Sequence, residues 1–204
     1  MTLDSAKQLL DGFLQSVVPT LGFRRVDRLV YTRPVNEAAA LLSFPCRLDP
    51  RGPGCFSCNV GLRFQSLEPF LLGETKPIVP TVMMPLHLLR EKKSFTEWEF
   101  YATSDLERLR DTVICELVNI ALPFVERYSK LTELHRKLES PTPTDWFVLG
   151  PEQRLNVFAA TQFVQGDKPG ALKRLDDALL ERKTALPGKR LPIEAVRKRL
   201  AEAV

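Results

Sequence analysis

The stretch Phe56-Ser57-Cys58-Asn59-Val60-Gly61-Leu62-Arg63-Phe64-Gln65 decides the fold class, because apolar residues alternate along it with polar or small ones. Successive side chains of a β-strand point to opposite faces, so this alternation predicts one strand with a buried and a solvated face. We expect the core to hold the apolar set Phe56, Cys58, Val60, Leu62 and Phe64. The other face, with Ser57, Asn59 and Arg63, should meet solvent or a partner.

Three other segments predict strands around this one. A β-hairpin is predicted for residues 23–33 and 38–44, which Pro34–Glu37 separates. A further strand is predicted over residues 95–101, where side chains alternate between two faces and Trp98 and Phe100 share one of them. Residues 66–92 are rich in proline and predict an irregular excursion with one short helix. The result is an antiparallel sheet of about four strands.

Helical periodicity appears before and after the predicted sheet. Apolar residues at steps of three and four predict an N-terminal helix over residues 4–18, ended by Pro19. A second apolar stripe predicts one long helix over residues 104–139 with a kink or a break at Pro123. Ser104 followed by Glu107 has the spacing of a capping box at its start. Together with the sheet, these helices predict an α+β fold.

The segment from Ser140 to Asp145 alternates proline with threonine and is the best linker in the chain. It divides the sequence into an α+β domain over residues 1–140 and a helical extension over residues 145–204. Small residues around Gly166 predict a tetratricopeptide-like helical hairpin in the extension, with Pro151 and Pro192 each in the first turn of a helix. An extension of this size makes a marginal core, so we expect it to dock on the long helix and not to fold alone.

The composition is that of an ordinary globular chain, with 204 residues, 44% hydrophobic residues and 26% charged residues. The N-terminus has no basic segment followed by an apolar run, and no stretch of about 18 apolar residues could span a membrane. We therefore expect a cytoplasmic protein whose four cysteines stay reduced.

Common catalytic and metal-binding patterns are missing from the sequence. Cys55 and Cys58, with Cys46 before them and His87 after them, invite a zinc site. Positions three apart on a strand face opposite sides, however, and a second close-set pair of ligands is lacking. The other histidine, His135, has no recognisable catalytic partner, and no nucleotide-binding or hydrolase motif occurs. The sequence predicts no cofactor, no metal site and no catalytic residue.

Basic residues offer the candidate binding surfaces. The chain carries 29 Lys and Arg against 25 Asp and Glu, and the net charge of +4 comes from the region after residue 167. The two candidate partner-binding groups are Arg24, Arg25, Arg28 and Arg33 near the N-terminus, and Lys189, Arg190, Arg197, Lys198 and Arg199 near the C-terminus. Such groups bind either an acidic protein or the phosphates of a nucleic acid.

Three short segments that follow the predicted N-terminal helix resemble those of a known protein family. They are Leu21-Gly22-Phe23-Arg24-Arg25, Val30-Tyr31-Thr32-Arg33 and Phe56-Ser-Cys-Asn-Val-Gly-Leu62. Over residues 5–130 the chain resembles the uncharacterised bacterial family called domain of unknown function 4304. The resemblance implies a helix packed on an antiparallel sheet, and it implies no agreed activity or cofactor. Because some relatives are thought to lie near bacterial toxin systems, it also implies an immunity-type binding role.

These observations favour a non-enzymatic, cytoplasmic protein-interaction module, with an immunity-like inhibitor of a toxin as one form of it. The predicted partner is another protein, acidic in character, and not a membrane. One alternative is a nucleic-acid-associated accessory factor that uses the basic C-terminal tail. A second alternative is an enzyme whose site has no recognised motif.

Overall fold

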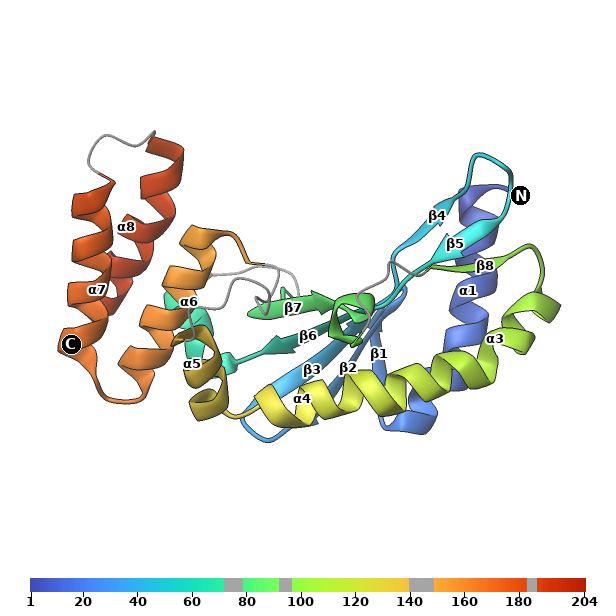
Figure 1. Cartoon of the computed structure of the whole chain (residues 1–204), viewed down its shortest axis with the longest axis horizontal. Helices are drawn as coiled ribbons and strands as arrows, with labels where there is room; N and C mark the ends of the chain where they lie inside the picture. Colours follow the sequence, from blue (N-terminus) through green and yellow to red (C-terminus); the bar gives the residue numbers. More distant parts are fainter. Residues whose placement is uncertain (72–78, 92–96, 140–148, 183–186) are drawn as a thin grey trace.

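The computed structural model describes residues 1–71, 79–91, 97–139, 149–182 and 187–204. The predicted linker at residues 140–145 lies outside the described residues. The fold is α+β: Figure 1 shows α1, α3 and α4 packed along the strands, with α6, α7 and α8 at one end of an elongated molecule. No helix within the described ranges is long and apolar enough to cross a membrane.

The described strands form two antiparallel sheets, of order β1-β2-β3-β6-β7 and β4-β5-β8, in place of the single sheet of about four strands that the sequence predicts. The strands are β1 Arg24–Asp27, β2 Val30–Val35, β3 Ala38–Ser43, β4 Cys46–Leu48, β5 Gly54–Phe56, β6 Asn59–Arg63, β7 Val82–Pro85 and β8 Trp98–Phe100. The helices are α1 Leu3–Val17, α2 Glu68–Leu71, α3 Thr103–Glu116, α4 Leu122–Tyr128, α5 Leu131–Glu139, α6 Pro151–Val164, α7 Lys168–Glu181 and α8 Pro187–Glu202.

The prediction of one continuous strand over residues 56–65 is wrong, because the chain passes from one sheet to the other after Phe56. β4 follows β3 beyond Pro45, and Pro45 has no N–H to donate to a ladder. The Ser57 N–H donates to the Pro45 carbonyl across this bend (3.2 Å), which divides one long hairpin into β3 with β6 and β4 with β5.

The predicted core face of that segment is confirmed despite the break. All five of its apolar side chains are at most 2% exposed, and Cys58 is among them. Ser57, Asn59 and Arg63 are half-buried, so they are less exposed than the alternation predicts. Cys55, expected away from the apolar face, is also buried, although it lies outside the two hydrophobic clusters.

The structure differs from the sequence prediction in two other segments. Residues 23–33 form two strands, because the chain turns tightly at Arg28 and Leu29, where Leu29 has a φ of 61°. Within residues 66–92, the described part contains α2 and also β7, a strand that was not predicted. β7 pairs with β6 through Met84 and Val60. The predicted hairpin between residues 23–33 and 38–44 is confirmed by the antiparallel pairing of β2 with β3.

α1 confirms the first predicted helix. It starts at Leu3, after a capping box in which Thr2 and Ser5 exchange hydrogen bonds, and a 3₁₀ turn containing Pro19 follows it. Its apolar face is buried, with Leu10 and Leu14 fully inaccessible to solvent.

The predicted capping box at Ser104 is wrong. α3 begins one residue earlier, and the Asp105 carboxylate accepts hydrogen bonds from the N–H groups of Tyr101 (2.9 Å) and Ala102 (3.1 Å). These bonds satisfy donors that a helix start leaves free, and they lower the pKa of Asp105.

The predicted long helix is continuous only to Tyr128. Leu117–Ala121 forms a π-helical turn between α3 and α4, in which the Leu122 N–H donates to Leu117 O. Pro123, next along the chain, cannot donate an N–H and its ring would collide with the carbonyl four residues before it, so a widened turn accommodates it. The chain then breaks at Ser129 and Lys130, and α5 starts in a new direction.

The turn between β2 and β3 holds this break in place. The Glu37 N–H donates to the Ser129 carbonyl (3.2 Å) and Asn36 Nδ2 donates to Ser129 Oγ (2.6 Å). The Glu37 carboxylate in turn accepts a hydrogen bond from the Leu131 N–H (3.1 Å), so it caps the first turn of α5.

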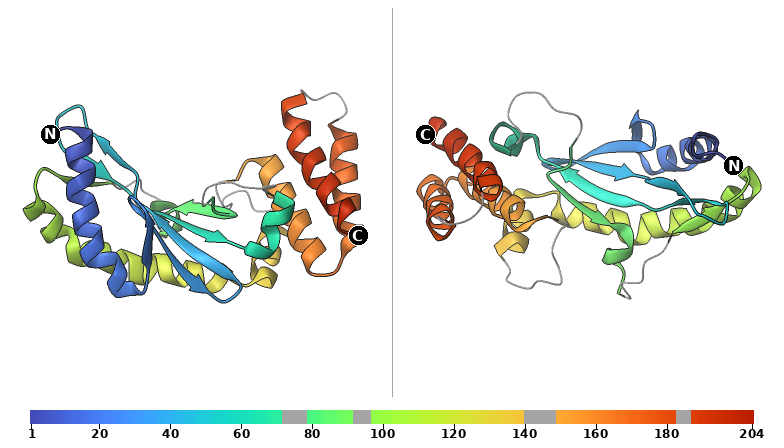
Figure 2. Two further views of the ribbon diagram at one scale, coloured as in Figure 1. Left: turned by 180° about the vertical axis from the view of Figure 1, so that it is seen from behind. Right: turned by 90° about the horizontal axis from the view of Figure 1, so that it is seen from above.

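The C-terminal helices pack against the rest of the chain through α6 and through a contact of α8 with α2. α6 contacts α5, α2 and the 3₁₀ turn at Gln65–Leu67, and α7 and α8 pack on α6. Figure 2 shows the same three helices together at one end of the molecule in two further views. Pro151 begins α6 as predicted, but Pro192 lies inside α8, which begins at Pro187.

Tyr31 gives the fold a testable pH dependence. Its side chain is fully buried, its ring packs edge-on to Phe44 (6.1 Å between centroids), and its hydroxyl has no partner among the described residues. Burial, followed by the charge of Asp11, raises the pKa of Tyr31 from 10.0 to about 12.

We therefore expect stability to be lost at alkaline pH. The folded protein keeps the phenol proton between pH 10 and 12, where the unfolded chain releases it. The contribution of Tyr31 to the free energy of unfolding is therefore fully present below pH 10. It falls by about 3 kcal/mol as the pH rises to 12. Urea unfolding of the protein and of Tyr31→Phe at several pH values in this range measures the effect. If the free energy of unfolding fell equally steeply with pH in both proteins, the prediction would be contradicted.

Candidate functional site

A groove of about 630 Å³ runs between α6 and α7. The two helices are antiparallel neighbours joined by a turn in which Gly166 has a φ of 101°, a conformation that favours glycine. Asp167 caps α7 by accepting a hydrogen bond from the Gly170 N–H (3.0 Å), and it also accepts one from Gln162 Nε2 (2.5 Å). These contacts fix the register of the two helices and therefore the shape of the groove.

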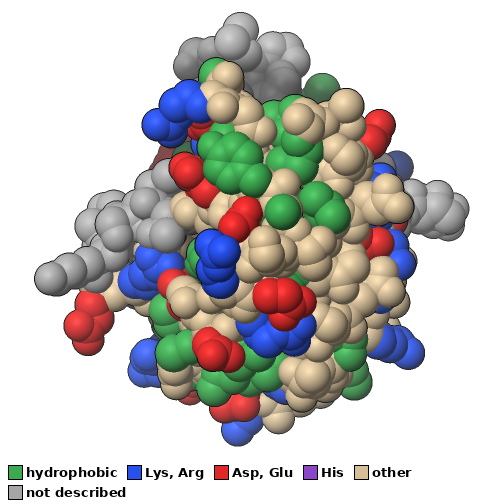
Figure 3. Space-filling view, turned by 90° about the vertical axis from the view of Figure 1, so that its right-hand side faces the viewer, with side chains coloured by type: hydrophobic (Ala, Val, Ile, Leu, Met, Phe, Trp, Pro, Cys, Tyr) green, Lys and Arg blue, Asp and Glu red, His purple; other side chains and the backbone are tan. Residues whose placement is uncertain are grey.

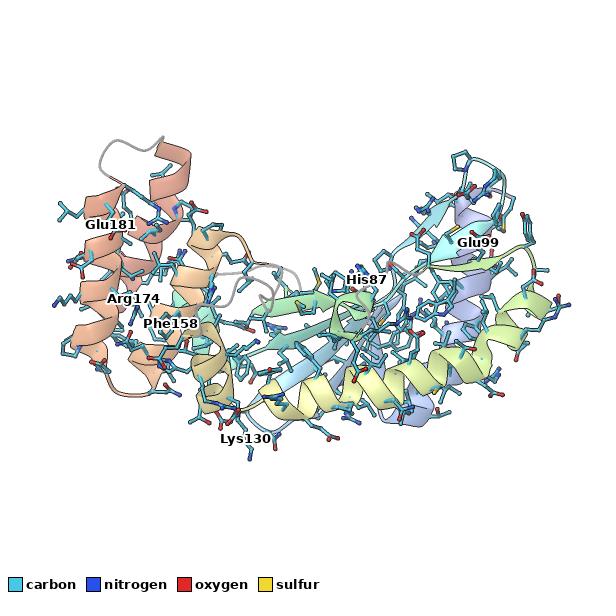
Figure 4. The ribbon with its side chains drawn as sticks, viewed as in Figure 1. His87, Glu99, Lys130, Phe158, Arg174 and Glu181 are labelled. Carbon is cyan, nitrogen blue, oxygen red and sulfur yellow. The ribbon has the colours of Figure 1, made fainter. Side chains whose placement is uncertain are left out.

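Arg174 of α7 and Phe158 of α6 form the centre of the groove (Figure 4). The guanidinium carbon of Arg174 lies 4.1 Å from the centroid of the Phe158 ring, and Arg174 Nε donates to Gln162 Oε1 (3.1 Å). Stacking and a hydrogen bond together hold the guanidinium in one orientation. No described residue hydrogen-bonds to its two terminal amino groups, which leaves them available to a ligand.

The second neighbour of Phe158 is His135 of α5, whose ring centroid is 4.9 Å away. His135 Nδ1 is buried and has no hydrogen-bond partner among the described residues. The Gln162 hydrogen bond, then the Gly170 N–H, and then the charges of Arg174 and His135 lower the pKa of Asp167. Asp167 is therefore a carboxylate at neutral pH.

The groove carries more positive than negative charge. Its charged lining residues, within the described part of the chain, are the cations Arg154, Lys173, Arg174 and Arg182, and the anions Asp177 and Glu181. Arg154 donates to the Leu138 carbonyl (2.6 Å), and burial lowers the pKa of its guanidinium. Four positive and two negative side chains around an aromatic floor make a site for an anionic group attached to an apolar body.

The N-terminal arginines predicted to bind a partner lie around β1 and β2, away from this groove (Figure 1). Arg25 pairs with Asp11 of α1 (3.0 Å), and Arg28 donates to the Asp4 carbonyl (3.3 Å). Arg33 donates to the Leu21 carbonyl (3.1 Å) and stacks on Phe23. Three of the four arginines thus connect the sheet to α1 and to the turn that follows it. Arg24 is exposed on the edge strand.

The C-terminal group lies on α8, where the described side chains also have partners within the chain. Arg197 pairs with Asp176 of α7 (2.7 Å), Lys198 pairs with Glu202 (3.8 Å), and Arg199 donates to the Phe70 carbonyl. Lys189 and Arg190 belong to the first turns of α8, and their side chains lie outside the described part. The structure does not bring the two predicted groups together.

The end of the molecule opposite the groove carries both signs of charge. Figure 3 shows acidic and basic side chains intermixed there. In the β4–β5 region Arg47 pairs with Glu97, and Arg51 pairs with Asp49 (2.9 Å). Among the described side chains on this face, neither sign of charge predominates as it does in the groove.

The cysteines are all free thiols, and no group of three His, Cys, Asp or Glu side chains is placed to hold a metal ion in the described parts of the chain. Cys55 belongs to β5, whereas Cys58 follows it in the connection to β6. Burial raises the pKa of the thiols of Cys46, Cys55 and Cys58, so all three are protonated at neutral pH. His87 lies well away from Arg174 (Figure 4).

Sequence reasoning missed the residues of the groove, although it predicted the hairpin that forms it. Arg154, Phe158 and Gln162 recur every four residues along α6, and Arg174 and Ala178 do so along α7. This spacing puts each set on one face of a helix. The spacing was a usable signal, but no local pattern shows that the two faces meet.

Comparison of the chain with protein-family models, with curated proteins and with solved structures found no match.

Proposed function

We propose that the protein is a cytoplasmic protein-interaction module that binds an acidic segment of a partner protein in the groove between α6 and α7. The observation that carries this proposal is the Arg174 guanidinium, stacked on Phe158 and held by Gln162. A guanidinium already fixed in orientation loses little conformational freedom when it binds a carboxylate through two hydrogen bonds.

The charges at the rim favour a protein partner over a nucleic acid. Asp177 and Glu181 are exposed on the same helix as Arg174, one and two turns further along. Duplex DNA carries a negative charge about every 1.7 Å, so these carboxylates would repel part of any phosphate backbone in the groove. A peptide can place a single carboxylate at Arg174 and neutral or basic residues near Asp177 and Glu181.

The resemblance over residues 5–130 suggests one kind of partner. If it reflects kinship, the acidic segment would belong to a toxin and the protein would act as an immunity-type inhibitor. The groove itself lies after residue 130, so its binding chemistry is a separate proposal from the resemblance.

Selection of random linear peptides on the full-length protein tests the proposal. We expect the recovered peptides to combine an Asp or Glu with an apolar neighbour, because Arg174 and Phe158 lie side by side. Arg174→Met keeps an unbranched apolar side chain on the ring and removes the charge. It should weaken the synthesised peptides about 10- to 150-fold, as expected for loss of hydrogen bonds to a charged group.

Arg108→Met is the matched control, since it removes a guanidinium whose side chain is 79% exposed on α3. It should leave peptide affinity unchanged. Peptides without acidic residues, or equal affinities for the protein and Arg174→Met, would contradict the proposal. Salt-sensitive binding of oligothymidylate that Arg174→Met abolishes would assign the groove to a nucleic acid.

A further inference from the structure

A second pocket, of about 420 Å³, lies on the other flank of α6. Residues from α2, from the segment that leads into β7, from the N-terminal half of α6 and from α8 form it, so the β-rich part and the C-terminal helices both contribute. Its described lining includes Leu71, Val79, Thr81, Glu152, Asn156 and Val157. Its volume lies within the range of small-molecule sites, which often form between structural units.

Asn156 is the most unusual residue of this pocket. It is 6% exposed, and its Nδ2 donates to the Pro192 carbonyl of α8 (3.3 Å). Its Oδ1 is buried and has no hydrogen-bond partner among the described residues. Buried polar atoms are nearly always satisfied, so an unpaired acceptor in the wall of a pocket indicates a bound group with a donor.

The charge of the pocket is opposite to that of the neighbouring groove. The lining includes the carboxylates of Glu68 and Glu152 and, among its described members, no Lys, Arg or His. Arg63 pairs with Glu68 (2.9 Å to Oε2), so Glu152 is the lining carboxylate without a described ion-pair partner. Glu152 also lies in the first turn of α6, where its charge offsets the positive end of the helix dipole.

We infer that this pocket binds a small organic cation, an aliphatic chain that ends in an ammonium or guanidinium group. The aliphatic part would contact Leu71, Val79 and Val157, and the N–H donors would reach the Glu152 carboxylate. Binding would require the Asn156 amide to turn so that Oδ1 accepts a further N–H of the same group. The chemistry is the same for a free amine and for the side chain of a lysine or arginine on a partner.

The inference does not depend on the proposed function. The two sites use alternate faces of α6: the groove takes Arg154, Phe158 and Gln162, and the pocket takes Glu152 and Asn156. Either site can therefore fail its test while the other passes.

Titration of ¹⁵N-labelled full-length protein with n-butylguanidinium and n-butylammonium tests the inference. We expect saturable shifts of the amide signals of Val79, Thr81, Gln153 and Asn156, and we expect none with the neutral analogue pentanamide. Glu152→Gln should weaken binding about 10-fold or more, as expected for loss of a charge-assisted hydrogen bond. Glu99→Gln, which removes an exposed carboxylate of β8 at the other end of the molecule (Figure 4), is the matched control and should leave the affinity for both cations unchanged.

Two further arms keep the test decisive. Val79→Trp should fill the pocket and abolish the shifts while the remaining spectrum shows that the protein is folded. N-acetyl-arginine-N-methylamide distinguishes the sources: shifts at the same amides support a side chain of a partner, and binding of the free amines alone supports a soluble ligand. No saturable shift up to about 50 mM cation, equal binding of pentanamide, or unchanged affinity in Glu152→Gln would overturn the inference.

Discussion

Replacement of Phe56 by alanine is expected to lower the free energy of unfolding by about 3–5 kcal/mol. Phe56 is fully buried at the end of β5, where the chain passes from the smaller sheet to the larger one. Its ring lies 4.9 Å from that of Trp98, 5.9 Å from that of Phe100 and 6.5 Å from that of Phe13, measured between centroids. The substitution therefore leaves a cavity where α1, β5 and β8 meet.

Urea unfolding followed by circular dichroism measures this loss. Tyr101→Ala is the control, because Tyr101 follows β8 directly and is 63% exposed. It should change the free energy of unfolding by less than about 0.5 kcal/mol. A loss below about 1 kcal/mol for Phe56→Ala would mean that the aromatic cluster is not the centre of the core.

The isolated segment of residues 145–204 is expected to show no cooperative thermal transition. Within it, Val157, Phe158 and Ala160 of α6 belong to the large hydrophobic cluster of the β-rich part, whereas Ala159 and Phe163 belong to the smaller cluster with α7 and α8. α6 is thus buried on two sides, and removal of residues 1–144 exposes one of them. A core as small as the remaining one does not offset the entropy of ordering three helices.

A fragment of residues 130–204 is the informative comparison, because it restores α5 and the contact between His135 and Phe158. It should gain helix content per residue by circular dichroism relative to the shorter fragment. A sharp transition in residues 145–204, at the temperature where the full chain unfolds, would show that the extension is an independent domain.

The predictable part of the fold is the part that depends on local periodicity. The alternation from Phe56 to Phe64 predicted five buried side chains, because a period of two survives a bend in the strand. The division into two sheets was not predictable from that segment, since the bend involves Pro45, which lies between β3 and β4, well before the segment in the sequence. β7 was missed because it is only four residues long, ends at Pro85 and follows Pro80 closely, and prolines at this spacing indicate a loop.

The helical predictions failed where a tertiary contact sets the boundary. The apolar stripe continues from Tyr128 to Leu131, so periodicity alone predicts one helix, whereas Ser129 is held by the distant turn at Asn36 and Glu37. The groove shows the same limit. Arg174 and Phe158 each have an ordinary helical spacing, and only the packing of α7 on α6 makes them a pair.

The capping of α5 by Glu37 couples strand register to the direction of the C-terminal helices. Val35 and Ala38 pair directly, so Asn36 and Glu37 are a two-residue turn and their position depends on the alignment of β2 with β3. If the two strands slipped by one residue, Glu37 would move away from the Leu131 N–H, and the first turn of α5 would lose its cap. The hairpin register therefore fixes where α5 begins, and α5 in turn packs on α6, the helix that contributes residues to both pockets.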